Sequence, residues 1–183
     1  MACTSYTLSG INDICKQASF GGIKDVYIAL YDDISGVTLD ENQEQIDEIT
    51  LTTNGKFYAY HLLKSTGGLT STLNVSETTT SYFTNEVTLQ FMKMETSKRM
   101  KMMALFMSAC VVIVKDYNNQ YWYLGKDTYV EASAGTATTG TATSDSNHYE
   151  ITLTDTSAEL PYAVSETAIG TLKQNGKIVE PED

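Results

Sequence analysis

The segment TSKRMKMMALFMSACVVIVKD, residues 96–116, most constrains what this chain can fold into, because its periodicity changes along its length. Its first half has the spacing of a helix that is apolar on two sides. One stripe contains Met100, Met103, Ala104 and Met107, and the other contains Met102, Leu105, Phe106 and Ala109. The second half, CVVIV, is typical of a buried strand. One domain core covers only one face of a helix, so the sequence predicts that the other stripe contacts something else.

A membrane is one surface that an apolar helix contacts, and the length of this run argues against it. The run extends from Met102 to Val114, contains Ser108 and is bounded by Lys101 and Lys115. A membrane-spanning helix needs about 20 predominantly apolar residues. The first 17 residues have neither the basic region nor the apolar core of a secretory signal. We therefore expect no membrane partner and a chain that stays in the compartment where it is made.

Length, charge and cysteine content narrow the class of protein. With 183 residues the chain is long enough for one domain with a substantial core. Its three cysteines are widely spaced and form no CxxC pair, which argues against a disulfide framework or a zinc site and favours a reducing compartment. The formal charge of −11 is unfavourable for non-specific attraction to nucleic acid, which needs clustered Lys and Arg.

Strand signals occur along most of the chain. Residues 25–31 place Val26, Ile28 and Leu30 on one side of a predicted strand and Tyr27 and Tyr31 on the other, so both faces of this strand are expected to be at least partly covered. Residues 85–95 alternate apolar and polar side chains, as a strand with one face in a core does. Residues 110–125 and 128–155 each predict a hairpin, the second with the small-residue tip GTATTGTATSDSN. A further hairpin is predicted at 50–62, where an Asn-Gly pair suits a type I′ turn. The sequence thus predicts a mainly β domain with one principal helix.

The predicted organisation has three parts and no linker between separate domains. Residues 1–24 form an arm, and residues 25–164 form the β domain, with its helix near 97–109 and an N-cap hydroxyl from Thr96 or Ser97. Residues 165–183 form an extended tail with a small hairpin at Asn175-Gly176. The glycine pairs at 21–22 and 67–68 lack the lysine and helix of a phosphate-binding loop and are predicted to be turns.

The order of these elements resembles the tube-type structural proteins of tailed bacteriophages, which include tail tube subunits and ring proteins of the neck and tail. The resemblance covers roughly residues 25–164 in the order of elements. It is strongest in YWYLGKDTYVEASAGTATTGTATSDSNHYEITLT and the following ELPYAV, which look like a late hairpin of phage virion proteins. In style the sequence also resembles proteins of crAss-like gut phages.

The resemblance implies an α+β fold in which an antiparallel β-barrel or sandwich is flanked by a helix. It implies a virion structural protein of the tail or neck, made in the host cytoplasm, whose copies form a hexameric or dodecameric ring. Adjacent neck or tail proteins would dock onto this ring, and genomic DNA would pass through its channel without specific binding. The resemblance leaves open whether the protein is a tail tube subunit, a neck ring or a tail terminator.

A ring would give both stripes of the helix a partner. We expect one stripe to cover its own sheet and the other to contact a neighbouring subunit, since large exposed apolar surfaces mark interfaces and methionine adapts to irregular contacts. The residues assigned to this interface are Met102, Leu105, Phe106 and Ala109.

Acidic side chains also gain a role in such a ring. Six copies would carry a formal charge of about −66, and acids on the channel wall would keep DNA from adhering. The candidates for the channel or rim are Asp32, Asp33, Asp40, Glu41 and Glu44. A solvated turn is the alternative for each of them, and their spacing does not follow a calcium-binding loop.

No combination of residues in the sequence predicts catalysis, a metal site or a cofactor. His61 and His148 have no Cys or His neighbour at ligand spacing, and Cys110 begins an apolar strand. We therefore expect a protein that is not an enzyme. The alternative is a carbohydrate-binding β-sandwich module, with Trp122 and nearby tyrosines as a platform for sugar rings.

Overall fold

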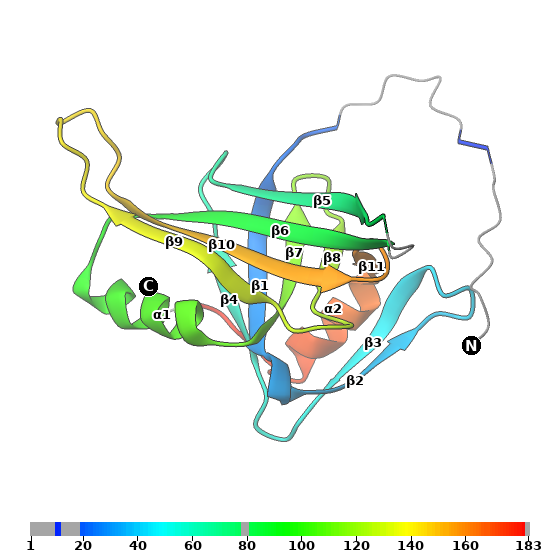
Figure 1. Cartoon of the computed structure of the whole chain (residues 1–183). Helices are drawn as coiled ribbons and strands as arrows, with labels where there is room; N and C mark the ends of the chain where they lie inside the picture. Colours follow the sequence, from blue (N-terminus) through cyan, green and yellow to red (C-terminus); the bar gives the residue numbers. More distant parts are fainter. Residues whose placement is uncertain (1–9, 12–18, 78–80, 182–183) are drawn as a thin grey trace.

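The computed structural model describes residues 10–11, 19–77 and 81–181, which form two packed β-sheets and two α-helices (Figure 1). The class is therefore the β-rich α+β class that the sequence predicts. Most of the predicted arm, residues 1–24, lies outside the described residues.

The larger sheet has eight strands and is mixed. Its order is β12-β4-β1-β7-β8-β11-β3-β2. The strands are β1 (Ile23–Leu30), β2 (Ile34–Leu39), β3 (Gln45–Leu51), β4 (Phe57–His61), β7 (Cys110–Asp116), β8 (Tyr121–Leu124), β11 (Tyr162–Val164) and β12 (Ile178–Val179). The pairs β11–β3 and β12–β4 are parallel, and the other pairs are antiparallel.

The smaller sheet has four antiparallel strands in the order β5-β6-β10-β9. Its strands are β5 (Gly67–Val75), β6 (Ser81–Met92), β9 (Glu131–Thr138) and β10 (His148–Ser157). Helix α1 (Thr96–Met107) follows β6 and lies beside β9, whereas α2 (Glu166–Gln174) lies against the larger sheet (Figure 1). A short 3-10 helix, η1 (Tyr31–Asp33), joins β1 to β2.

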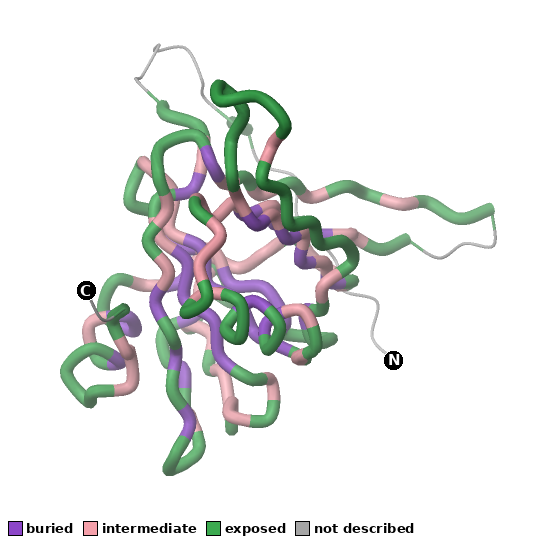
Figure 2. The backbone as a smooth tube through the Cα atoms, turned by 90° about the vertical axis from the view of Figure 1, so that its left-hand side faces the viewer, coloured by how far each residue is buried: buried purple, intermediate pink, exposed green. Residues whose placement is uncertain are grey.

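The larger sheet separates two hydrophobic cores, so its central strands are buried on both faces. In β1, Val26 and Ile28 contribute to the core shared with the smaller sheet, whereas Tyr27 and Ala29 contribute to the core beneath α2. This burial explains why β1 and β7 read as almost continuous apolar runs. The buried positions gather in the centre of the molecule, and the hairpin tips are exposed (Figure 2).

Several predicted strand pairs are confirmed. Strands β7 and β8 form the hairpin predicted at 110–125, and β9 and β10 form the hairpin predicted at 128–155, around the tip at 139–147. Strand β6 has the predicted alternation, with Val87 and Leu89 fully buried. Cys110, at the start of β7, is buried and free, and its burial raises the pKa of the thiol to about 11.

The hairpin predicted at 50–62 is wrong. Strand β3 pairs with β2 and β11, and β4 pairs with β1 and β12, on the other side of the sheet. Neither Asn54 nor Gly55 has the positive φ that a type I′ turn requires. The Lys177 ammonium instead donates to the carbonyl oxygens of Thr52, Thr53 and Gly55 at 2.9, 2.9 and 3.3 Å. The loop is therefore held by a distant lysine and does not join two paired strands.

The extended tail predicted at 165–183 is also wrong. Ser165 is the N-cap of α2, and its Oγ accepts a hydrogen bond from the Ala168 amide at 3.1 Å. Asn175 ends this helix, and Gly176 follows with a φ of 64°, so the Asn-Gly pair forms a helix end and no hairpin. The glycines at 67–68 begin β5 and do not form a turn of their own.

Candidate interface surfaces

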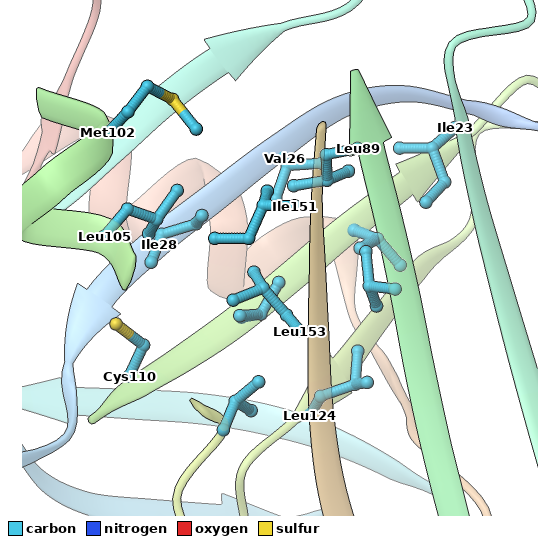
Figure 3. Close-up of a cluster of buried hydrophobic side chains, with 14 of the residues drawn as sticks. Ile23, Val26, Ile28, Leu89, Met102, Leu105, Cys110, Leu124, Ile151 and Leu153 are labelled. Carbon is cyan, nitrogen blue, oxygen red and sulfur yellow. The ribbon is translucent and has the colours of Figure 1, made fainter. Parts of the chain in front are cut away.

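The buried side of α1 is the side that the sequence analysis assigned to a subunit interface. Met102 and Leu105 are only 4% and 5% exposed and lie in the core between the sheets, near Ile28 (Figure 3). Phe106 packs against the same core over Gly135 of β9, where an added Cβ would lie 2.5 Å from the Phe106 ring. The interface assignment is therefore wrong for Met102 and Leu105, since their own chain covers them.

The predicted end and the predicted N-cap of this helix also need correction, whereas nothing in the structure contradicts the interface assignment of the exposed Ala109. Ala109 is exposed but lies beyond the end of α1, in the link to β7. The N-cap residue is Glu95, and it makes no side-chain capping hydrogen bond, so neither Thr96 nor Ser97 caps the helix.

The methionine face of α1 consists of Met100, Met103 and Met107. These side chains are 66%, 41% and 78% exposed, which makes them the largest apolar surface on one helix of the described chain. Helical spacing places Arg99 on one side of this face and Lys101 on the other. The sequence contained this stripe, but its apolar content equals that of the buried one, so composition alone does not distinguish the two.

The smaller sheet ends in two strands that lack a second partner within the described chain. Strand β5 pairs only with β6, and β9 pairs only with β10. Strands β5 and β9 have nine and eight residues, and neither contains the lysine or proline that commonly protects an edge strand. Their outer main-chain groups can therefore pair with a strand of another chain.

The outer face of the smaller sheet is polar and carries no positive charge. On β6, Glu86, Thr88 and Gln90 alternate with the buried Val87 and Leu89. All four strands of this sheet lack Lys and Arg. The outward acids are Glu86, Glu131 and Glu150, of which Glu150 accepts a hydrogen bond from Gln90. These acids are not among those predicted for the channel, because an isolated Glu in an alternating strand carries no special signal.

The acids predicted for the channel or rim lie instead around β2 and β3. Asp32 and Asp33 belong to η1 at one end of β2, whereas Asp40, Glu41 and Glu44 lie in the turn at its other end. A six-residue strand spans roughly 20 Å, so the structure does not bring the five acids into one cluster. Asp40 has a structural role, because its Oδ1 accepts from the Glu44 and Gln45 amides at 2.7 and 3.2 Å.

A buried polar cluster lies near the end of β10. Asn85 is 1% exposed and donates from Nδ2 to Asp155 at 2.8 Å, and Asp155 also accepts from the Gly125 amide at 2.8 Å. Burial raises the pKa of Asp155 above its ordinary value. The Oδ1 atom of Asn85 has no hydrogen-bond partner among the described residues, and the adjoining cavity of about 10 Å³ is close to the size of one water molecule.

His61 lies on the surface between two carboxylates. Its Nδ1 is 2.7 Å from Asp25 Oδ1, and its Nε2 is 3.0 Å from Glu180 Oε2. The hydrogen bond with Asp25 is the main cause that raises the pKa of His61 above its ordinary value. This group fastens the residues after β12 to β1 and β4. No sequence pattern indicates it, because Asp25 and Glu180 are 36 and 119 residues from His61. His148 begins β10, and its Nδ1 contacts the Ser146 hydroxyl.

A cleft of about 290 Å³ lies beside Trp122, the residue proposed as a sugar platform. Phe20, Asp116 and Asn118 also line it. The indole Nε1 of Trp122 lies 3.5 Å from Asp116 Oδ2, and the side-chain amide of Asn118 both donates to and accepts from the main chain of Phe20. Trp122 is half-buried against the core between the sheets.

Among the described residues, no group of three or more His, Cys, Asp or Glu side chains is arranged to hold a metal ion. Neither helix in the described part of the chain has the length and apolar character that crossing a membrane requires. No protein-family model matches the chain, and no curated protein or solved structure matches it significantly.

Proposed function

We propose that this chain is a virion structural protein of a tailed phage, whose copies form a ring around a DNA channel in the tail or the head-tail neck. The observation that carries the proposal is the smaller sheet, a set of four long strands with two edges that no other described strand pairs and a polar outer face without basic residues. The fold is also consistent with the resemblance of the sequence to tube-type phage proteins.

The two edges of this sheet suit a ring because they differ from each other. If β5 of one copy pairs with β9 of the next, the contact is heterologous, and a heterologous contact produces a ring when the rotation between neighbouring copies closes on itself. The sheet would then continue through every copy, and no edge would remain open to unwanted pairing. Main-chain hydrogen bonds would supply affinity along both strands.

The outer face of the smaller sheet would form the channel wall in this arrangement. The larger sheet covers its inner face, so the polar face is the one left for the lumen. Glu86, Glu131 and Glu150 would repel the phosphates of passing DNA, and the absence of Lys and Arg from these strands would prevent adhesion. We therefore propose these acids for the channel in place of the turn acids selected from the sequence.

A pair of edge substitutions tests the ring. Thr70 and Thr72 are exposed residues of β5, and the double substitution T70K/T72K places two charges on this edge. The matched control T167K/T171K makes the same chemical change at exposed positions of α2. We expect wild type and control to form rings in negative-stain images, and light scattering to show a several-fold lower mass for T70K/T72K.

The same measurements can contradict the proposal. A wild-type chain that stays monomeric over the whole concentration range would refute ring formation by this chain. Rings that form equally well in T70K/T72K would refute the assignment of β5 to the contact. Circular dichroism and the melting temperature of each variant establish that the monomer fold is retained.

The second candidate function is carbohydrate binding, because the Trp122 cleft combines an aromatic ring with nearby polar groups. Its volume is near the lower end of the range for small-molecule sites. Binding to a glycan array that is lost in Trp122→Ala would support this function. An array without signal for the wild-type chain would refute it.

A further inference from the structure

The charges of the chain are unevenly placed, with positive charge on α1 and negative charge around β2 and β3. Helix α1 contains three basic residues and no acid. Residues 32–48, which we call the acidic hairpin, contain seven acids and no basic residue. None of the salt bridges among the described residues involves these seven acids. Each region therefore has an excess of charge that the described chain does not pair.

We propose that the methionine face of α1 in one copy binds the acidic hairpin of a second copy. The inference rests on the proposed ring and adds the contact that joins one ring to the next. Arg99 and Lys101 flank the methionine face and would meet Glu41 and Glu44 at the tip of the hairpin. Lys98 is less available, because its Nζ donates to the Met92 carbonyl at 2.7 Å.

The positions of the two surfaces make this contact intermolecular. Figure 1 shows α1 at the lower left, beneath the β9–β10 tip, and the β2–β3 hairpin at the lower right. The strands of the smaller sheet run between these two ends (Figure 1). Pairing between β5 and β9 adds neighbouring copies side by side, in the direction across the strands. The ends of the strands then point towards the two rims of the ring, even when the strands are tilted as in a barrel. A contact between the two ends therefore joins copies in different rings.

The two surfaces also complement each other in chemistry. Methionine side chains adapt to an irregular partner, and the hairpin offers Val37 and Leu39, which are only half-buried. An apolar centre with charged residues at its rim is the usual anatomy of a specific interface. The opposite charges would also orient the approaching copies and disfavour contact between two hairpins or between two α1 helices.

Charge reversal tests the contact in the full chain. One variant is R99E/K101E, a second is E41K/E44K, and a third combines all four substitutions. The control K56E/K64E changes the net charge by the same amount as the first variant, at exposed lysines outside both surfaces. Sedimentation velocity separates single rings from stacked rings, and negative-stain images identify each species.

We expect R99E/K101E and E41K/E44K each to lower the association constant for stacking about tenfold or more, with single rings retained. The combined variant should recover stacking to within about threefold of wild type, because its reversed charges attract again. The control should stack as wild type does. Raising the salt concentration should weaken stacking of the wild type more than that of R99E/K101E.

Three outcomes overturn the inference. Rings that stack as strongly in R99E/K101E as in wild type remove the role of α1, and a combined variant that does not recover removes the pairing with the hairpin. Both results leave the ring proposal intact. A wild-type chain that stays monomeric overturns both proposals, whereas open chains that are sensitive to both charge reversals refute the ring and support the contact.

Discussion

Two methionines of α1 provide a direct test of which side of the helix is buried. Met102 is 4% exposed and Met100 is 66% exposed, so M102A and M100A make the same chemical change on opposite sides of one helix. Removing the Met102 side chain loses its hydrophobic transfer energy and leaves a cavity between the sheets. Such substitutions cost about 2–5 kcal/mol. The gain in helix propensity on replacing Met by Ala is common to both variants and cancels in the comparison.

The expected difference is large enough to measure by melting. For a chain of this size, 1 kcal/mol corresponds to a shift of about 2–4 °C, so a loss of about 3 kcal/mol predicts a melting temperature roughly 6–12 °C lower for M102A. M100A should stay within about 0.5 kcal/mol of wild type. Circular dichroism melts and urea unfolding of both variants, at a concentration where wild type is unassociated, measure the difference.

The result that refutes the reasoning is equally specific. If M100A lowers the free energy of unfolding as much as M102A does, the methionine face is covered within the chain, and no surface is left for a second copy. If M100A is the more destabilised variant, the helix is rotated relative to the structure. The companion variants M102E and M100E sharpen the contrast, since the first should unfold and the second should fold but fail to stack.

Two further predictions concern the C-terminal residues. His61 has a folded pKa raised above 6.5, mainly by its hydrogen bond with Asp25, so its contribution to stability is present below the unfolded pKa and is lost as the pH rises through the folded pKa. Because the His61 side chain is half exposed, we expect this contribution to stability to be less than about 1 kcal/mol. It is measured as the difference in the free energy of unfolding by urea between about pH 5.5 and about pH 8, and this difference should shrink in His61→Gln. An unchanged difference would contradict the role of His61. Ser165→Ala removes the N-cap of α2 and should cost about 1 kcal/mol, whereas Ser165→Asp should retain most of the stability. Equal melting temperatures for Ser165→Ala and wild type would show that the cap contributes nothing.

Strands with a clear alternation and a local partner could be predicted from the sequence. Strand β6 and the β9–β10 hairpin have period-two patterns, β7 is a continuous apolar run followed by a turn, and each of these strands has a partner adjacent in the chain. The 50–62 hairpin failed because its turn signal is local, whereas the pairing of β3 and β4 is decided by distant strands and by the Lys177 ammonium. A local turn sequence does not determine the partners of strands that pair with segments distant in the chain.

The helices illustrate a different limit. For α1, both stripes are equally apolar, and the phase is set by tertiary contacts such as Phe106 over Gly135, which the sequence does not reveal. For α2, usable signals were present, namely Ser165 at the N-cap and the buried spacing of Ala168, Ile169 and Leu172. The preceding proline and the Asn-Gly pair favour an extended segment and a hairpin instead, and these local signals conflict with the helical spacing. The candidate surfaces could not be predicted for the same reason. Which side of a helix or strand is exposed depends on its tertiary contacts, and the sequence does not reveal these.

The placement of β11 has a consequence for the order in which the protein is completed during synthesis. Among the described residues, the β2–β3 hairpin is hydrogen-bonded to the rest of the larger sheet only through β11, a strand of three residues that is translated more than 100 residues after β3. The β2–β3 hairpin therefore leaves the ribosome early but joins the sheet only after residue 164 has emerged. A nascent chain therefore holds the hairpin in its final position only when the fold is nearly complete. If the hairpin binds a second copy, as we propose, this contact forms after folding and not during it.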